Sequence, residues 1–110
     1  MVFIESRVFS RHLLALGKDG SAEVLSAIES DLLANPERGR VVPGLGGIRK
    51  ARAADPSRGK GRRGGFRYQY LYFASDREIY LLYLFDKDKR EDLSPGERKL
   101  LRDLAAESKR

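Results

Sequence analysis

The pattern of apolar and polar positions predicts a strand and then a helix at the start of the chain. The run Val2-Phe3-Ile4 is apolar and β-favouring, which is typical of a short strand. Ser6 is placed to cap a helix from about Arg7 to Leu16, whose apolar positions share one face. Gly17 follows the last of these positions, as expected for the residue just beyond a helix.

A second amphipathic helix is predicted from about Ser21 to Ala34. Leu25, Ile28 and Leu32 recur at helical spacing, so they lie on one side of this helix. Asn35-Pro36 should end it, because the residue before a proline avoids the α conformation. We expect the two consecutive helices to form a hairpin that covers one face of a sheet.

The middle of the chain is polar, basic and rich in glycine. Residues Arg38 to Gly47 are predicted to form a loop, because they contain Pro43 and several glycines. Ile48 to Ala53 alternates weakly and is predicted to be a strand. Ala54 to Gly65 reads as a mobile loop.

The clearest strand signal follows, in the aromatic segment from Phe66 to Ala74. Its alternation places Phe66, Tyr68, Tyr70 and Tyr72 on one face and Arg67, Gln69, Leu71 and Phe73 on the other. Ile79 to Phe85 is strongly apolar and should pair with this strand as a hairpin. A charged loop, Asp86 to Asp92, leads to the last helix, for which Ser94, Pro95 and Glu97 supply a capping box. The predicted order is β-α-α-β-β-β-α in one domain, residues 1–110.

Composition limits the kinds of site that the chain can hold. It has no Cys and one His, so neither a disulfide nor a thiolate metal site is expected, and we predict no metal and no other cofactor. No apolar run approaches the roughly 20 residues of a membrane span, and the N-terminus does not resemble a signal peptide. We therefore expect a cytoplasmic protein.

Positive charge is concentrated between Gly46 and Arg67. This stretch holds eight Lys and Arg residues against one acid, a net charge of +7, whereas the whole chain carries +6. The basic residues are Arg49, Lys50, Arg52, Arg58, Lys60, Arg62, Arg63 and Arg67. Clustered like charges repel one another unless a polyanion lies against them, so a nucleic acid is the expected partner. The GxxxxGK[ST] spacing of a nucleotide-binding loop is absent.

The candidate chemistry is cleavage of RNA by its own 2′-hydroxyl. This reaction needs a base, stabilisation of charge on the phosphate, and an acid for the leaving oxygen. His12 lies far from the basic stretch, so we interpret it as a structural helical histidine. A lysine among other cations can serve as a base, and arginine grips phosphate oxygens. From the residues alone, catalysis and simple phosphate contact remain equally open. The five tyrosines are expected to pack across strands, although one exposed ring would suit base stacking.

Five segments together resemble toxins of the RelE/ParE superfamily, in particular its HigB-like branch. They are Gly47–Arg52, Gly59–Arg67, Ile79–Leu82, Phe85–Lys87 and Asp92–Glu97. The resemblance implies an α+β fold with a mainly antiparallel sheet, an N-terminal helical hairpin on one face and a C-terminal helix. It also implies an endoribonuclease that cleaves mRNA in the ribosomal A site without a metal, and a co-encoded HigA-like antitoxin with a helix-turn-helix domain.

By position, the resemblance assigns the catalytic roles to Lys50, Arg52, Arg67 and Lys87. Lys87 or Lys50 would be the base, and Arg67 and Arg52 would hold the phosphate. The other basic residues, Arg49, Arg58, Lys60, Arg62 and Arg63, would bind rRNA or mRNA. Many relatives carry Tyr-Pro-Lys where this chain has Phe85-Asp86-Lys87, so no tyrosine can act at that point.

Two alternatives stay open at this stage. One is a ParE-like toxin that inhibits DNA gyrase without cutting RNA, although such a protein does not need the basic stretch for catalysis. The other is an RNA- or ribosome-binding module without activity.

Overall fold

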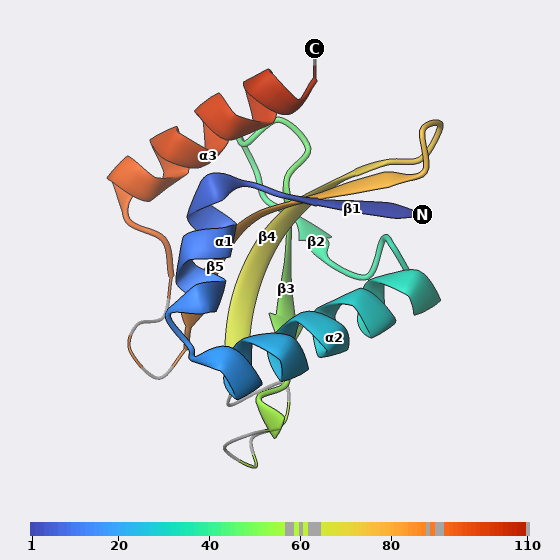
Figure 1. Ribbon diagram of the computed structural model, residues 1–110. Coiled ribbons are helices and arrows are strands. Elements are labelled where there is room, and N and C mark those ends of the chain that lie inside the picture. The colour runs from blue at the N-terminus through green and yellow to red at the C-terminus, as the bar shows by residue number, and fades with distance from the viewer. Residues whose placement is uncertain (57–58, 60, 62–64, 88, 90–91, 110) are drawn as a thin grey trace.

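The computed structural model describes residues 1–56, 59, 61, 65–87, 89 and 92–109. These residues form a five-stranded sheet with two helices on one face and a third helix on the other (Figure 1). The strands are β1 (Val2–Glu5), β2 (Arg40–Val41), β3 (Arg49–Ala53), β4 (Phe66–Phe73) and β5 (Glu78–Asp86). The helices are α1 (Arg7–Leu14), α2 (Lys18–Ala34) and α3 (Pro95–Ser108).

The sheet has the spatial order β1-β5-β4-β3-β2. β1 runs parallel to β5, with Val2 opposite Glu78, and the other neighbours are antiparallel. The α+β class and the mainly antiparallel sheet are therefore confirmed. The long hairpin of β4 and β5 forms the centre of the sheet (Figure 1).

The helical hairpin covers one face of the sheet, as the apolar pattern predicts. Phe9 of α1 and Ile28 of α2 are fully buried against Tyr68 and Tyr70 of β4. Ser6 fixes the start of α1, because its hydroxyl accepts a hydrogen bond from the Phe9 amide and donates one to the Leu82 carbonyl in β5. One side chain thus caps the helix and joins it to the central strand.

Helix α3 packs on the opposite face through Leu101 and Ala105. The capping box is present: Glu97 N–H donates to the Ser94 hydroxyl and Ser94 N–H donates to the Glu97 carboxylate. Leu71 of β4 lies beneath this helix, in the second core. The two faces predicted for the aromatic strand are therefore confirmed.

Two sequence predictions need correction. The segment from Arg38 to Gly47 is not entirely loop, because Arg40–Val41 pairs with Lys50 and Arg49 as β2. The element order is therefore β-α-α-β-β-β-β-α. Helix α2 also begins at Lys18 rather than Ser21. A two-residue strand is too short to show alternation, so its pairing partner decides its conformation.

No helix in the described part of the chain is long and apolar enough to cross a membrane.

Candidate nucleic-acid interface

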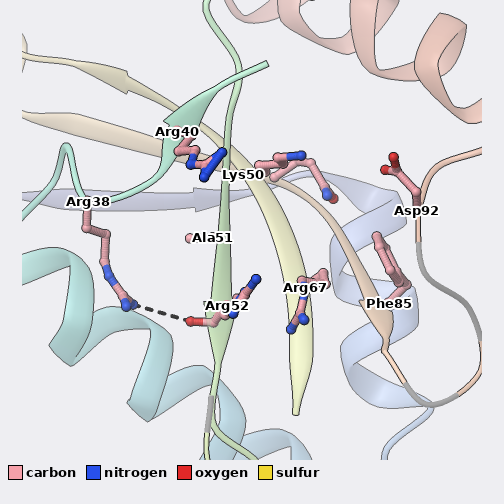
Figure 2. Close-up of a pocket in the computed structure, with 9 residues that line it drawn as sticks. Arg38, Arg40, Lys50, Ala51, Arg52, Arg67, Phe85 and Asp92 are labelled. Atoms are coloured by element: carbon pink, nitrogen blue, oxygen red, sulfur yellow. Dashed lines mark hydrogen bonds between the residues drawn. The ribbon is translucent and has the colours of Figure 1, made fainter. Parts of the chain in front are cut away.

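A basic cleft of about 600 Å³ lies on the sheet face opposite the helical hairpin, beyond the area that α3 covers. Its described lining residues are Arg38, Arg40, Lys50, Ala51, Arg52, Arg67, Gln69, Phe85 and Asp92 (Figure 2). Five of these side chains are cationic and one is acidic. The cleft therefore suits a polyanionic ligand.

The strand register arranges the cleft floor in two rows that run across the sheet. In the first row Arg52 lies opposite Arg67, and Arg67 lies opposite Phe85. In the second row Arg40 lies opposite Lys50, and Lys50 lies opposite Gln69. Each row thus starts with cations on β2 or β3 and ends, toward β5, with a side chain that carries no charge.

The Arg52–Arg67 pair favours binding of a phosphate. Residues directly opposite each other in an antiparallel pair have Cβ atoms roughly 5 Å apart, so both guanidinium groups can reach the same anion. Guanidinium groups stay protonated and present a planar fork of donors that matches the oxygens of a phosphate.

The glycine before the Phe-Arg pair has a steric role. A Cβ built on Gly65 would lie 2.1 Å from the Ala53 carbonyl oxygen, so no other residue fits where β3 and β4 approach each other. Phe66 is then buried in the core and Arg67 emerges on the cleft face. The Gly65-Phe66-Arg67 sequence therefore sets the position of a candidate phosphate ligand.

A buried tyrosine holds the segment that precedes β2. The Tyr70 hydroxyl accepts a hydrogen bond from Gly39 N–H at 3.0 Å and donates one to the Pro36 carbonyl at 2.7 Å. Burial raises the pKa of Tyr70, and the hydrogen bond from Gly39 offsets part of that rise. These contacts fix the chain just before Arg40, which starts the second row.

Arg38 is held at the edge of the cleft by two acceptors. Its Nη1 atom forms an ion pair with Asp31 at 2.7 Å. The same atom donates to the Arg52 carbonyl at 3.3 Å, the contact dashed in Figure 2. The side chains of Arg38 and Asp31 are both largely shielded from solvent. Arg38 therefore links α2 to β3, and its charge is already balanced in part.

Three of the four predicted catalytic residues, Lys50, Arg52 and Arg67, line the cleft together. Lys87 is not among the described lining residues. It follows directly on β5, where its backbone N–H donates to the Gly65 carbonyl at 3.2 Å. Its side chain is half-buried.

Arg49 is the one predicted RNA-binding residue within the described part of the chain, and it lies apart from this floor. Arg49 points away from the cleft, since its guanidinium donates to the carbonyl oxygens of Glu37 and Gly39 and contacts the Glu37 carboxylate at 3.4 Å. The other four, Arg58, Lys60, Arg62 and Arg63, lie outside the described residues.

The sequence analysis did not identify six of the described lining residues, namely Arg38, Arg40, Ala51, Gln69, Phe85 and Asp92. The alternation of β4 already placed Gln69 on the same face as Arg67, so that signal was available. Arg40 gave no signal because β2 has only two residues, too few to show an alternating pattern. Asp92 gave none because it lies among other charged residues in the loop before α3. In the described part of the cleft the aromatic side chain is Phe85, not a tyrosine.

His12 has a structural position, as predicted. Its Nδ1 atom is hydrogen-bonded to the Leu84 carbonyl at 2.7 Å, and its ring meets the edge of Tyr83 at 4.9 Å between centroids. It joins α1 to β5 and is not among the described residues that line the cleft. The described residues also contain no group of three or more His, Cys, Asp and Glu that could hold a metal ion.

Comparison with known proteins agrees with this architecture. Residues 21–110 match the family model described as the RelE toxin of the RelE / RelB toxin-antitoxin system. A chain of the intact E. coli RelBE toxin-antitoxin complex is similar in fold, with a TM-score of 0.56 and 13% identity over 77% of this chain and 94% of that one. A mutant of E. coli RelE in the free state gives a TM-score of 0.56 and 14% identity, over 82% of this chain and 86% of that one. The isolated E. coli RelE toxin gives a TM-score of 0.55 and 12% identity, over 94% of this chain and 97% of that one.

Proposed function

Since the chain belongs to the RelE toxin family, we propose that it is a ribosome-dependent mRNA endonuclease of the HigB-like branch. It would act in the cytoplasm on translated mRNA, in the ribosomal A site. The observation that carries the proposal is the pair of cationic rows in the cleft, above all Arg52 opposite Arg67.

The proposed reaction uses the RNA 2′-hydroxyl as the nucleophile. The hydroxyl oxygen attacks the adjacent phosphorus, a 2′,3′-cyclic phosphate forms, and the 5′-oxygen of the next nucleotide leaves with a proton. Arg52 and Arg67 would hold the non-bridging oxygens, whose charge grows in the transition state. Lys50 lies in the row next to Arg52 and Arg67 and is the lysine among the described residues that line the cleft. It would take the proton of the 2′-hydroxyl. Lys87 would act from the end of β5 as the second proton carrier.

The test is to express the toxin and map the 5′ ends of cellular mRNA, beside the variants Arg67→Ala and Arg67→Lys. Loss of one donor to a developing oxyanion typically costs roughly 10²–10³ in rate, so we expect Arg67→Ala to remove cleavage and growth arrest. Arg67→Lys should restore only a small part, because an ammonium lacks the planar fork. The matched control is Arg77→Ala, an exposed arginine at the β4–β5 turn, outside the cleft.

The outcomes separate the proposed activity from its alternatives. New 5′ ends confined to translated reading frames support the proposal, and their loss in Arg67→Ala supports the site. Toxicity with intact mRNA and damaged DNA would instead favour inhibition of gyrase. Salt-sensitive RNA binding with neither cleavage nor growth arrest would favour a binding module.

We also propose an antitoxin encoded beside the toxin as its partner, of the HigA-like helix-turn-helix type. The family description pairs toxin with antitoxin, which supports a partner of this general kind. Co-expression of the adjacent reading frame should restore growth and co-purify with the toxin. A neighbour without a helix-turn-helix domain that still neutralises the toxin would overturn the HigA-like assignment.

A further inference from the structure

The loop of residues 36–39 joins α2 to β2 and is held by side chains from two strands. Arg49 of β3 donates from its Nη1 atom to two backbone carbonyl oxygens of this loop, that of Glu37 at 3.2 Å and that of Gly39 at 2.8 Å. The Tyr70 hydroxyl of β4 accepts the Gly39 N–H at 3.0 Å. Backbone groups with this many partners open rarely, so loop 36–39 has a fixed position.

Both of these side chains reach the loop from the face of the sheet opposite the cleft. Arg49 and Tyr70 are partners in the register of β3 and β4, and Tyr70 lies in the core under the helical hairpin. Successive side chains of a strand point to opposite faces, and Lys50, the next residue, lines the cleft. Arg49 is not among the described residues that line it. An RNA in the cleft therefore does not meet the Arg49 side chain.

Arg40 is the cation that loop 36–39 delivers to the cleft. It follows the loop directly, lies opposite Lys50 and lines the cavity beside it (Figure 2). Its side chain is exposed, and among the residues that the structure describes none forms an ion pair or a hydrogen bond with it. β2 has only two residues, so its own pairing is short. The place from which Arg40 can reach a ligand thus depends on the loop before it.

We propose that Arg49 is a positioning residue, which holds Arg40 at the rim of the cleft for an RNA phosphate. It acts through loop 36–39 and does not touch the RNA. This inference rests on the proposed function, in that it takes RNA as the ligand. The two cationic rows lie two residues apart along β3, about 7 Å. Arg40 is therefore placed for the phosphate next to the one that Arg52 and Arg67 hold.

The shape of the Arg49 guanidinium matters here more than its charge. The Glu37 carboxylate lies 3.4 Å from Arg49 but is 67% exposed, so this ion pair contributes little. Lysine is shorter than arginine, and its ammonium lacks the planar fork, so it cannot bridge the two carbonyl oxygens. Arg49→Lys therefore removes the hold on the loop without changing the net charge. A residue that contacted phosphate directly would tolerate this substitution.

The test measures the affinity of the purified toxin for a short 2′-O-methyl oligoribonucleotide, which binds but has no free 2′-hydroxyl to react. Arg40→Ala should weaken binding about tenfold, as expected for one hydrogen bond to a charged group. It should also reduce the slope of log K against log salt by about 0.7. Arg49→Lys should cause most of the same loss of affinity and of slope. Arg102→Lys, which replaces an exposed arginine of α3, is the matched control and should bind as the wild type does.

The double variant shows through which residue Arg49 acts. In a protein that already carries Arg40→Ala, Arg49→Lys should cause no further loss of affinity, because the contact that it positions is gone. Asn35→Ala is a milder second variant, since it removes only the surface acceptor of the Glu37 N–H. It should weaken binding by less than Arg49→Lys, and again only while Arg40 is present.

Hydrogen exchange shows that the change is local. The Gly39 amide, which is bonded to Tyr70, should exchange faster in Arg49→Lys. The amides of β4 and β5 should keep the protection that they have in the wild type.

The outcomes distinguish this inference from the proposed function. Unchanged affinity in Arg49→Lys would overturn the positioning role. A loss of equal size with and without the Arg40 side chain would also overturn it, since Arg49 would then act by direct contact or through the fold as a whole. The expected coupling in a protein that never cuts mRNA would support positioning and overturn the endonuclease. If the wild-type toxin does not bind the oligoribonucleotide at any salt concentration, both are overturned.

Discussion

Two tyrosines on β4 should respond in opposite ways to the same substitution. Tyr68 and Tyr70 lie two residues apart on one face of the strand, and neither is exposed. The Tyr70 hydroxyl has two hydrogen-bond partners, Gly39 N–H and the Pro36 carbonyl. The Tyr68 hydroxyl is buried and makes no hydrogen bond of ordinary geometry in the described part of the chain, although the Arg38 guanidinium lies near enough to lower its pKa. Replacement by Phe removes one hydroxyl oxygen in each case. The difference in stability between the two variants therefore reports the contribution of the hydrogen bonds that Tyr70 makes.

The expected cost of Tyr70→Phe follows from what the lost oxygen leaves behind. Pro36 is half-buried, so its carbonyl can turn to water, but Gly39 is buried and its N–H loses its acceptor. An unsatisfied buried donor costs about 1–3 kcal/mol, and a hydrogen bond contributes about 1 kcal/mol net. We therefore expect the free energy of unfolding to fall by about 2–3 kcal/mol, which lowers Tm by roughly 10 °C.

Tyr68→Phe should leave the free energy of unfolding unchanged or raise it by up to about 1 kcal/mol, because it removes a buried hydroxyl without a partner. Urea unfolding followed by circular dichroism measures both variants. Tyr72→Phe, on the same strand but half-buried, is the control for loss of an accessible hydroxyl and should change little. Equal destabilisation by Tyr68→Phe and Tyr70→Phe would refute the reasoning, since hydrogen bonding would then not decide the outcome.

Four further predictions concern alkaline stability, the edge strand, the last helix and the cleft charge. Burial raises the pKa of Tyr68 to about 12, and Arg38 offsets part of that rise, so this tyrosine ionises first in the unfolded chain. The free energy of unfolding should therefore fall by roughly 2–3 kcal/mol between pH 10 and 12, as measured by urea unfolding across this range. The fall should be smaller in Tyr68→Phe. Gly39→Ala places a Cβ 2.8 Å from the Lys50 carbonyl oxygen, so it should loosen β2 and increase amide hydrogen exchange there. Ser94→Ala removes the cap of α3 and should cost about 1 kcal/mol in thermal unfolding. Affinity for single-stranded RNA should fall with salt, and Arg67→Ala should reduce the slope of log K against log salt by about 0.7, the value for one phosphate contact.

Local signals in the sequence were enough to predict most of the fold. The alternation of β4 determined which side chains face the helical hairpin, and the Ser94 capping box marked the start of α3. The parallel pairing of β1 with β5 has no local signal, because it joins segments more than 70 residues apart. The strand β2 likewise depends on its partner rather than on its own two residues.

The candidate site was only partly predictable, for a related reason. Charge density and the resemblance to a known family led to Lys50, Arg52 and Arg67, all of which line the cleft. Gln69 and Phe85 carry no charge and lie in an apolar, aromatic hairpin, so composition gives them no prominence. Their position became apparent only when the strand register placed them beside the cations.

The pairing of β1 with β5 also has a consequence for the synthesis of the protein. Val2–Glu5 pairs in the sheet with residues 78–81, so β1 cannot take its place until β5 has been made. The cleft needs β5 as well, since Phe85 closes the first row. Contacts this distant in sequence form slowly, after the loop between them has been closed. A nascent chain therefore lacks the complete cleft until the residues through Asp86 have left the ribosome that makes it, which delays any activity of the toxin at least until that point.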